Sequence, residues 1–299
     1  MPLNRSLLFA PGNHARRVEK AFTLGADAVI LDLEDAVAVS DKVATRRLVA
    51  EALAWPRACR GYVRVNAPST EFCYGDLVAV IGVGVDGVVV PKIESAADLH
   101  AIDWLVANLE RERGLAVGSI DLMPIVETAA GVSRLDRILQ ARSLRTYSGA
   151  WRVKRLAFGA ADFSHDAGLA PSLDEDELAH ARARIVLASR AAGFEGPIDS
   201  PWFHLREPQA FARALERSRR TGFQGRLCIH PDQVAPVNAA FTPSDEEVAR
   251  AEKIVAAFKA AEASGVAAIE VDGQMVDYPV AHRAQAVLDA VRAVRSRSA

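Results

Sequence analysis

The stretch Ala28-Val29-Ile30-Leu31-Asp32-Leu33 is an almost continuous apolar run of strand-forming residues. Such a run, without alternating polar positions, is typical of a parallel strand that is buried on both faces. A similar run, Ser6-Leu7-Leu8-Phe9, precedes it, and the residues between the two runs predict a helix that ends near Gly25. The order strand, helix, strand indicates an α/β protein with a parallel sheet.

Six further runs of the same kind continue this alternation along the chain. They lie at 62–65, 87–90, 122–126, 156–159, 197–199 and 226–229. Helical patterns occupy the intervals, most clearly at 174–193, where apolar residues recur every three or four positions. Eight strand and helix pairs without a linker rich in Gly, Ser or Pro favour one closed (β/α)8 TIM barrel over two doubly wound domains.

The last part of the chain lies beyond the eighth strand. Ser244-Asp245-Glu246-Glu247 predicts a capping box that opens a helix, and Asp272-Gly273 predicts a two-residue hairpin turn before a terminal helix. We therefore predict a catalytic barrel domain at 1–243 and a C-terminal helical and hairpin extension at 244–299. The sequence leaves open whether this extension covers the barrel mouth as a lid or packs on a neighbouring subunit.

Composition narrows the class of protein and of partner. Of 299 residues, 50% are hydrophobic and 25% are charged, which suits a large globular core, and the net charge of −2 favours neither nucleic acid nor an anionic membrane as a partner. The three cysteines have no C-x-x-C spacing, and the first apolar run stops at Pro11-Gly12, too early for a signal peptide or a membrane span. We expect a cytoplasmic protein.

Polar residues follow the predicted strands at the end of the barrel where active sites lie. They are Glu34, Asp35, Arg64, Asn66, Lys92, Glu94, Glu127, Thr128, Asp162, Asp199, Ser200 and His230. Because carboxylates dominate this set and no Cys or His pair accompanies them, the expected cation is Mg²⁺, with Glu127 and Asp162 as its ligands and zinc disfavoured. Arg64 would direct a bidentate donor at a carboxylate or an enolate oxygen, which indicates carbon–carbon bond chemistry beside a carbonyl.

Each of these residues also has a purely structural interpretation. The structural alternatives are ion pairs of Glu34 and Asp35 with Lys42 or Arg46, a Lys92–Glu94 pair, helix capping by Glu127, Thr128 or Asp162, a structural Arg64, and a hydrogen-bonded core histidine at His230. The functional interpretation depends on all of the residues meeting at one rim.

A series of short motifs occurs in strand order along nearly the whole chain. They are Arg5-Ser6-Leu7-Leu8-Phe9-Ala10-Pro11-Gly12, Leu31-Asp32-Leu33-Glu34-Asp35-Ala36-Val37, Arg64-Val65-Asn66, Pro91-Lys92-Ile93-Glu94, Pro124-Ile125-Val126-Glu127-Thr128, Phe158-Gly159-Ala160-Ala161-Asp162-Phe163, Ile198-Asp199-Ser200-Pro201 and Cys228-Ile229-His230-Pro231. The chain thereby resembles the HpcH/HpaI aldolase and citrate lyase family, in its branch similar to the citrate lyase β subunit, which includes malyl-CoA and citramalyl-CoA lyases.

This resemblance implies roles for particular residues. Mg²⁺ would be held by Glu127 and Asp162, and Arg64 would contact the substrate. The amides of Gly159, Ala160, Ala161 and Asp162 would hold the carboxylate of a 2-oxo acid, and Glu34 and Asp35 would bind the metal's water molecules. Asp277 matches the family's lid acid, a general acid/base, and the basic candidates for CoA are Arg16 and Arg17.

The resemblance also implies a reaction and an assembly. We expect a Mg²⁺-dependent lyase that cleaves or forms a β-hydroxyacyl-CoA such as malyl-CoA or citramalyl-CoA, giving acyl-CoA and a 2-oxo acid. The alternatives are a citrate lyase β subunit acting on a carrier-bound citryl thioester, a malyl-CoA thioesterase, and a CoA-free 2-oxo acid aldolase. A homotrimer or hexamer is expected, with Asp277 delivered to a neighbouring subunit's site, and an acyl-carrier protein is the partner in the second case.

Overall fold

Eight parallel strands close into a barrel in sequence order within residues 3–82, 84–141, 149 and 151–298, which the computed structural model describes. The ring closes where β1 pairs with β8, and this architecture confirms the predicted (β/α)8 TIM barrel. The barrel strands are β1 (Ser6–Pro11), β2 (Ala28–Asp32), β3 (Arg60–Arg64), β4 (Gly87–Val90), β5 (Asp121–Val126), β6 (Ala157–Phe158), β7 (Ile198–Asp199) and β8 (Gly225–Cys228).

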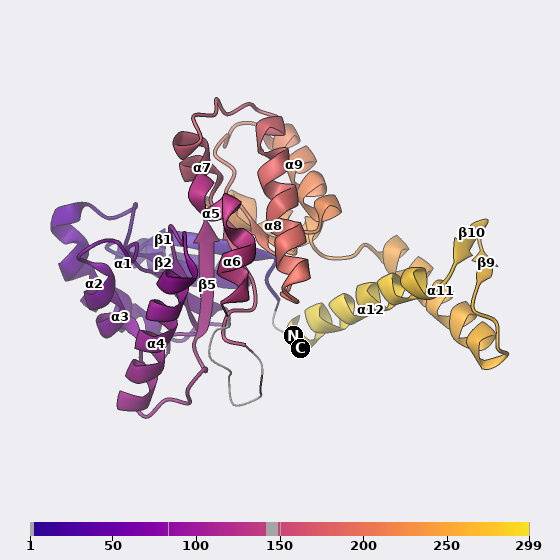
Figure 1. Ribbon diagram of the computed structural model, residues 1–299, viewed down its shortest axis with the longest axis horizontal. Helices are drawn as coiled ribbons and strands as arrows, with labels where there is room; N and C mark the ends of the chain where they lie inside the picture. Colours follow the sequence, from indigo (N-terminus) through magenta and orange to yellow (C-terminus); the bar gives the residue numbers. More distant parts are fainter. Residues whose placement is uncertain (1–2, 83, 142–148, 150, 299) are drawn as a thin grey trace. The chain divides into compact units, whose positions relative to one another are not determined.

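Helices surround these strands and supply the outer layer of the barrel (Figure 1). They are α1 (Ala15–Phe22), α2 (Lys42–Leu53), α3 (Cys73–Val80), α4 (Ala96–Glu112), α5 (Ala129–Ser133), α6 (Leu135–Gln140), α7 (Ala160–Asp166), α8 (Ala179–Ala191), α9 (Pro208–Thr221) and α10 (Val234–Ala240), with 3-10 turns η1 (Val39–Asp41), η2 (Asp176–Leu178) and η3 (Pro231–Gln233). None of the helices in the described part of the chain is long and apolar enough to cross a membrane.

Burial on both faces explains why the strands appear in the sequence as continuous apolar runs. Every residue of β2, β4 and β5 is buried, because one face of each strand packs inside the barrel and the other packs under the helices. The interior cluster comprises Leu7, Ala28, Ile30, Tyr62, Val89, Met123, Ile125, Ala157, Ile198 and Leu227. The barrel is therefore a packed core, and a ligand can enter only at an end.

The hydrogen-bonded ladders differ in length around the ring. β1–β2 and β2–β3 each align five residue pairs. By contrast, β5–β6 aligns two pairs, and β6–β7 aligns only Ala157 with Ile198. The predicted strand at 156–159 is shorter than expected because the chain turns at Gly159 and enters α7 one residue later.

The described chain separates into two compact units, one spanning Asn4–Asn238 and the other comprising Leu3 and the residues from Ala239 onward. The second unit contains α11 (Asp245–Ala263), β9 (Ile269–Val271), β10 (Gln274–Val276) and α12 (Tyr278–Ser298). The predicted capping box is confirmed, since Ser244 Oγ accepts from the Glu247 N–H at 3.2 Å. The predicted hairpin turn is also confirmed, with positive φ at Asp272 and Gly273. The domain boundary at 243/244 stays a prediction.

Candidate active site

A cavity of about 430 Å³ opens at the carboxyl ends of the barrel strands. It is lined by Phe9, Pro11, Asp32, Asp35, Ala36, Arg64, Ile125, Glu127, Gly159, Ala160, Ala161, Asp162, Pro201, Phe203, Leu227 and Ile229. Seven of the residues predicted to form the site therefore share one cavity. These are Asp35, Arg64, Glu127, Gly159, Ala160, Ala161 and Asp162.

Arg64, the last residue of β3, is held by the neighbouring strand. Its Nε and Nη2 donate to the two carboxylate oxygens of Asp32 at 2.8 and 2.6 Å, and its guanidinium lies 4.8 Å from the centre of the Phe9 ring. Asp32 at the end of β2 is level with Arg64 because the two are register partners. Carboxylates around the guanidinium hold the pKa of Arg64 above its usual range against the effect of burial. Arg64 is thus a fixed, permanent positive charge at the mouth.

Glu34 and Asp35 extend the same group of charges. Arg64 Nη1 lies 3.1 Å from Glu34 Oε2 and 3.3 Å from Asp35 Oδ2, and Lys92 Nζ lies 2.7 Å from Glu34 Oε1. Burial raises the pKa of Glu34, and Arg64 and Lys92 only partly oppose that effect. Glu34 is buried, whereas Asp35 is exposed at the rim of the cavity.

Glu127, which follows β5, is buried among other carboxylates. Its Oε1 accepts a hydrogen bond from the backbone N–H of Lys92 at 2.8 Å. Burial, and then the nearby charges of Glu34 and Asp162, raise the pKa of Glu127 to about 8. A Cβ atom on Gly159 would lie 2.4 Å from Glu127 Oε2, so only glycine leaves room for this carboxylate. Without a bound cation, the negative charge of the carboxylates at the mouth of the barrel exceeds the positive charge of the neighbouring side chains.

Gly159 is the N-cap residue of α7, and Ala160, Ala161 and Asp162 form the first turn of that helix. The N–H groups of a first helical turn have no acceptor one turn earlier in the helix, and they favour an anion. Asp162 is half-buried in the same turn and lines the cavity. The predicted anion-binding segment and the predicted second metal ligand therefore lie side by side.

We call Asp32, Glu34, Asp35, Arg64, Lys92, Glu127 and Asp162 the mouth cluster: five carboxylates against two cations. The described residues contain no group of three or more His, Cys, Asp or Glu side chains arranged to hold a metal ion. Mg²⁺ commonly takes only one or two protein carboxylates and keeps water molecules at its other positions. Glu127 and Asp162 suit such a site, because both are hard oxygen donors in a cluster whose carboxylates outnumber its cations.

Three further predicted site residues, Arg16, Arg17 and Asp277, belong to helices or their caps. Arg16 and Arg17 are exposed on α1, where their side chains form no hydrogen bond or ion pair with another described residue. Asp277 is half-buried directly before α12, where its Oδ1 accepts from the Val280 N–H at 3.2 Å. The structure thus gives Asp277 the position of a helix cap in the second compact unit.

Several structural alternatives for the rim residues are wrong. Lys92 pairs with Glu34 rather than with Glu94. Arg46 binds Asp76, and Thr128 rather than Glu127 caps α5 by accepting from the Gly131 N–H.

Lys42 also differs from its structural alternative, which paired it with Glu34 or Asp35. Its ammonium donates to the carbonyls of Leu33 and Glu34 and to Asn66 Oδ1, at 3.1, 2.6 and 2.7 Å. Lys42 and Asn66 therefore fix the loop after β2 and leave the carboxylate of Glu34 to face Arg64 and Lys92.

His230 and Asp199, both candidate site residues in the sequence, have structural contacts. His230 Nδ1 accepts from the Asp232 N–H at 3.3 Å and caps η3, so His230 is a cap rather than a core histidine. Asp199 is fully buried, 3.1 Å from Arg182 Nε and 3.5 Å from Arg226 Nη1, and both arginines also contact Glu175. We call Glu175, Arg182, Asp199 and Arg226 the paired cluster.

Asp32 was missed by the sequence analysis, although it forms the closest contacts of Arg64. The available signal was one carboxylate at the end of an otherwise apolar strand. The role of Lys92 was missed for another reason, since its partner Glu34 is 58 residues away in sequence.

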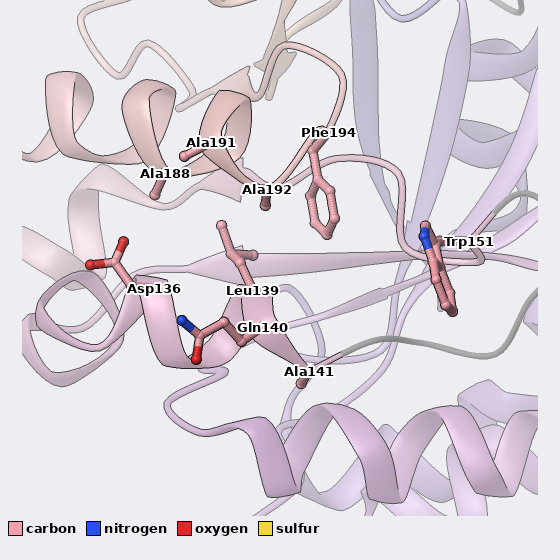
Figure 2. Close-up of a pocket in the computed structure, with 9 residues that line it drawn as sticks. All are labelled: Asp136, Leu139, Gln140, Ala141, Trp151, Ala188, Ala191, Ala192 and Phe194. Carbon is pink, nitrogen blue, oxygen red and sulfur yellow. The ribbon is translucent and has the colours of Figure 1, made fainter.

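Figure 2 shows a second cavity, of about 440 Å³, between α6 and α8. Its lining is mostly alanine and other apolar residues, with Asp136 and Gln140 as polar members, and none of the predicted site residues lines it. The mouth cavity is therefore the candidate active site.

Comparisons with known proteins cover most of the chain. The profile of the HpcH/HpaI aldolase/citrate lyase family matches residues 5–231. The chain is 34% identical to a citrate lyase subunit beta of Leuconostoc mesenteroides subsp. cremoris, covering 96% of this chain and 92% of that one. It is also 34% identical to an L-malyl-CoA/beta-methylmalyl-CoA lyase of Cereibacter sphaeroides, covering 95% and 93%. The structure of protein CitE from Mycobacterium tuberculosis, in complex with magnesium, acetoacetate and coenzyme A, has 30% identity and a TM-score of 0.77, covering 97% of this chain and 98% of that one.

Proposed function

On the premise that this chain belongs to the HpcH/HpaI aldolase/citrate lyase family and is a carbon–carbon lyase, we propose that it cleaves a β-hydroxyacyl-CoA. The products are an acyl-CoA and a 2-oxo acid, and the substrate is of the malyl-CoA or citramalyl-CoA kind. The observation that carries this proposal is the mouth cluster, in which a permanently charged Arg64 lies beside carboxylates in one cavity.

The metal in this proposal is Mg²⁺, held by Glu127 and Asp162. The shortage of positive charge around Glu127 supports this assignment, as does the complex of the related Mycobacterium tuberculosis protein with magnesium. Bound there, Mg²⁺ would polarise the oxygen of the 2-oxo acid. Glu34 and Asp35 would accept hydrogen bonds from its water molecules.

The chain's own residues account for binding. The first-turn amides of Ala160, Ala161 and Asp162 would hold the carboxylate of the 2-oxo acid. The Gly159 amide, predicted to join them, instead donates to the Val126 carbonyl at 3.1 Å. Arg64 would donate to the thioester oxygen, where negative charge develops as the bond breaks. Because Asp32 already fixes one edge of the guanidinium, through Nε and Nη2, Arg64 needs little reorganisation to make this contact.

Cleavage needs one proton removed and one proton delivered. A mouth carboxylate, Glu34 or Asp35, accepts the proton of the substrate hydroxyl, and the new carbonyl of the 2-oxo acid forms as the carbon–carbon bond breaks. The electron pair of that bond moves to the α-carbon of the thioester and forms its enolate. Asp277 or a water molecule then gives a proton to that carbon, and the acyl thioester is released.

Assembly and CoA binding are further parts of the proposal, supported by the family resemblance. We place the CoA near Arg16 and Arg17 in the first turn of α1, directly after the strand whose Pro11 lines the cavity. We also infer a cytoplasmic homotrimer or hexamer in which Asp277 serves a neighbouring subunit.

Asp277→Asn should keep the α12 cap and the melting temperature while lowering kcat about a hundredfold or more.

A carrier-bound citryl thioester is the second candidate substrate. It is supported by the citrate lyase subunit beta relative, whose identity to this chain equals that of the malyl-CoA lyase relative. In that case the protein would need an acyl-carrier protein as its partner.

The decisive experiment incubates the purified chain and Mg²⁺ with malyl-CoA and citramalyl-CoA isomers, and follows the products by mass spectrometry with EDTA controls. Equal release of acyl-CoA and 2-oxo acid, lost with EDTA, is the expected result. Free CoA with intact hydroxy acid would replace the lyase assignment with a thioesterase. Turnover only of free hydroxy acids, or only of a carrier-bound citryl thioester, would contradict the CoA substrate.

A further inference from the structure

Lys92 has an unusual backbone for a residue with a side chain. Its φ is +53°, in the left-handed region, which among the described non-glycine residues is shared only by Glu175 and Asp272. An L residue is sterically disfavoured there, and such positions often accompany functional sites. In this conformation the Lys92 N–H donates to Glu127 Oε1 at 2.8 Å.

The side chain of Lys92 acts on a different carboxylate. Its ammonium lies 2.7 Å from Glu34 Oε1, and the other oxygen of Glu34 lies 3.1 Å from Arg64 Nη1. The Lys92 side chain is 35% exposed, so this contact is made at the edge of the mouth rather than in the core. One residue therefore contacts both Glu127 and Glu34, from opposite ends.

We propose that Lys92 is a positioning residue that holds Glu127 through its main chain and Glu34 through its ammonium. The two carboxylates are kept apart and oriented, although both are negative and close to each other. This inference deepens the proposed function and rests on it, because it concerns how the mouth carboxylates are prepared for a divalent cation. Lys92 takes part in no covalent step.

The main-chain half of the proposal predicts an inverted order of stability between two variants. Lys92→Gly and Lys92→Ala both lack the ammonium, but only glycine adopts φ near +53° without strain. Lys92→Gly should therefore melt at a higher temperature than Lys92→Ala. At a position with ordinary backbone the order would be the reverse, because glycine adds freedom to the unfolded chain. The measurement is thermal unfolding of the full chain in EDTA.

The ammonium half predicts two effects of opposite sign in Lys92→Met. Removing a positive charge from the mouth should tighten Mg²⁺ binding by about threefold or more, because like charges repel. Freeing Glu34 from its partner should lower kcat by about tenfold, because the carboxylate loses its orientation. General damage to the fold would weaken both properties together. Calorimetric titration with MgCl₂ at fixed ionic strength measures the first effect, without turnover.

Two further variants complete the experiment. Lys92→Arg should recover much of the kcat, since a guanidinium also donates to a carboxylate. Arg47→Met removes one positive charge from an exposed pair with Glu51 on α2 and should change neither property.

An unchanged kcat in Lys92→Met, or weakened Mg²⁺ binding, would overturn the ammonium half. A higher melting temperature for Lys92→Ala than for Lys92→Gly would overturn the main-chain half. If the wild-type chain binds no Mg²⁺, the proposed function fails, and the melting comparison still decides the role of the Lys92 backbone.

Discussion

The mouth cluster and the paired cluster belong to the same barrel and use the same kinds of side chain. In the paired cluster, two carboxylates, Glu175 and Asp199, face the guanidiniums of Arg182 and Arg226. In the mouth cluster, five carboxylates face only Arg64 and Lys92. The two groups therefore differ in the balance of charge rather than in residue type.

This imbalance has a measurable signature. Burial alone would raise the pKa of Asp199, but Arg182 and Arg226 hold it below its usual range. Burial, Glu34 and Asp162 instead raise the pKa of Glu127 to about 8. Removing one partner of a buried ion pair destabilises the native fold, because the other charge is left without a partner. A buried carboxylate that has no opposite charge beside it already lowers the stability of the native fold. The comparison indicates that the mouth carboxylates are kept for a positively charged ligand.

The largest expected effect comes from Glu127→Gln. The amide oxygen can still accept from the Lys92 N–H, but the charge that would bind Mg²⁺ is gone. Turnover should fall by about a thousandfold or more, which corresponds to about 4 kcal/mol. In EDTA the free energy of unfolding should rise by about 1–2 kcal/mol, because one of several like charges is removed. Chemical denaturation and product release measure the two effects, and a clear loss of stability would break the comparison.

Asp199→Asn should show the opposite behaviour. Loss of this buried charge leaves Glu175 as the one carboxylate of the paired cluster that faces Arg182 and Arg226, and breaking such a group costs about 3–5 kcal/mol of unfolding free energy. The activity of the molecules that remain folded should change little, since Asp199 does not line the mouth cavity. Urea denaturation, followed by kcat at a temperature below the transition, separates the two readouts. A stable but inactive variant would contradict the structural role of Asp199.

Gly159→Ala should have a smaller effect and tests the geometry of the mouth rather than its charge. The added Cβ would lie 2.4 Å from Glu127 Oε2 and 2.6 Å from Glu127 Cβ, so the carboxylate must move. We expect kcat to fall by about a hundredfold, the order of loss that a displacement of about 1 Å causes. Gly82→Ala, where the new Cβ would meet nothing within 4 Å, is the matched control. Equal activity of both variants would show that Glu127 does not need its present position.

The fold was largely predictable because most of the barrel strands are fully buried and therefore stand out as apolar runs, as in Ala28–Asp32. The strand ends were less predictable where glycine turns the chain, as at Gly159 after the two-residue β6. The hairpin at Asp272-Gly273 was predictable because both turn residues have the positive φ that this dipeptide favours.

The candidate site was predictable in its members and not in its contacts. Arg64, Glu127 and Asp162 follow strands, and closing the barrel brings them to one cavity without any further information. The partners of these residues depend on which side chains face one another across the ring. The Lys92–Glu34 and Arg64–Asp32 contacts join residues 58 and 32 positions apart, so local spacing pointed to nearer partners such as Glu94.

Because the hydrogen-bonded ladders of the barrel differ in length, the backbone on the two sides of the mouth cavity should open locally at different rates. Arg64 and Asp32 end strands joined by five aligned pairs, whereas Gly159 and Asp162 follow a strand that shares only one aligned pair with β7. Backbone amides protected by few neighbouring hydrogen bonds exchange with solvent through small local openings. In deuterated water the β6–β7 side should therefore label well before the β2–β3 side. The β2–β3 wall of the cavity would then be rigid, whereas the β6–β7 wall would be able to adjust to ligands of different size.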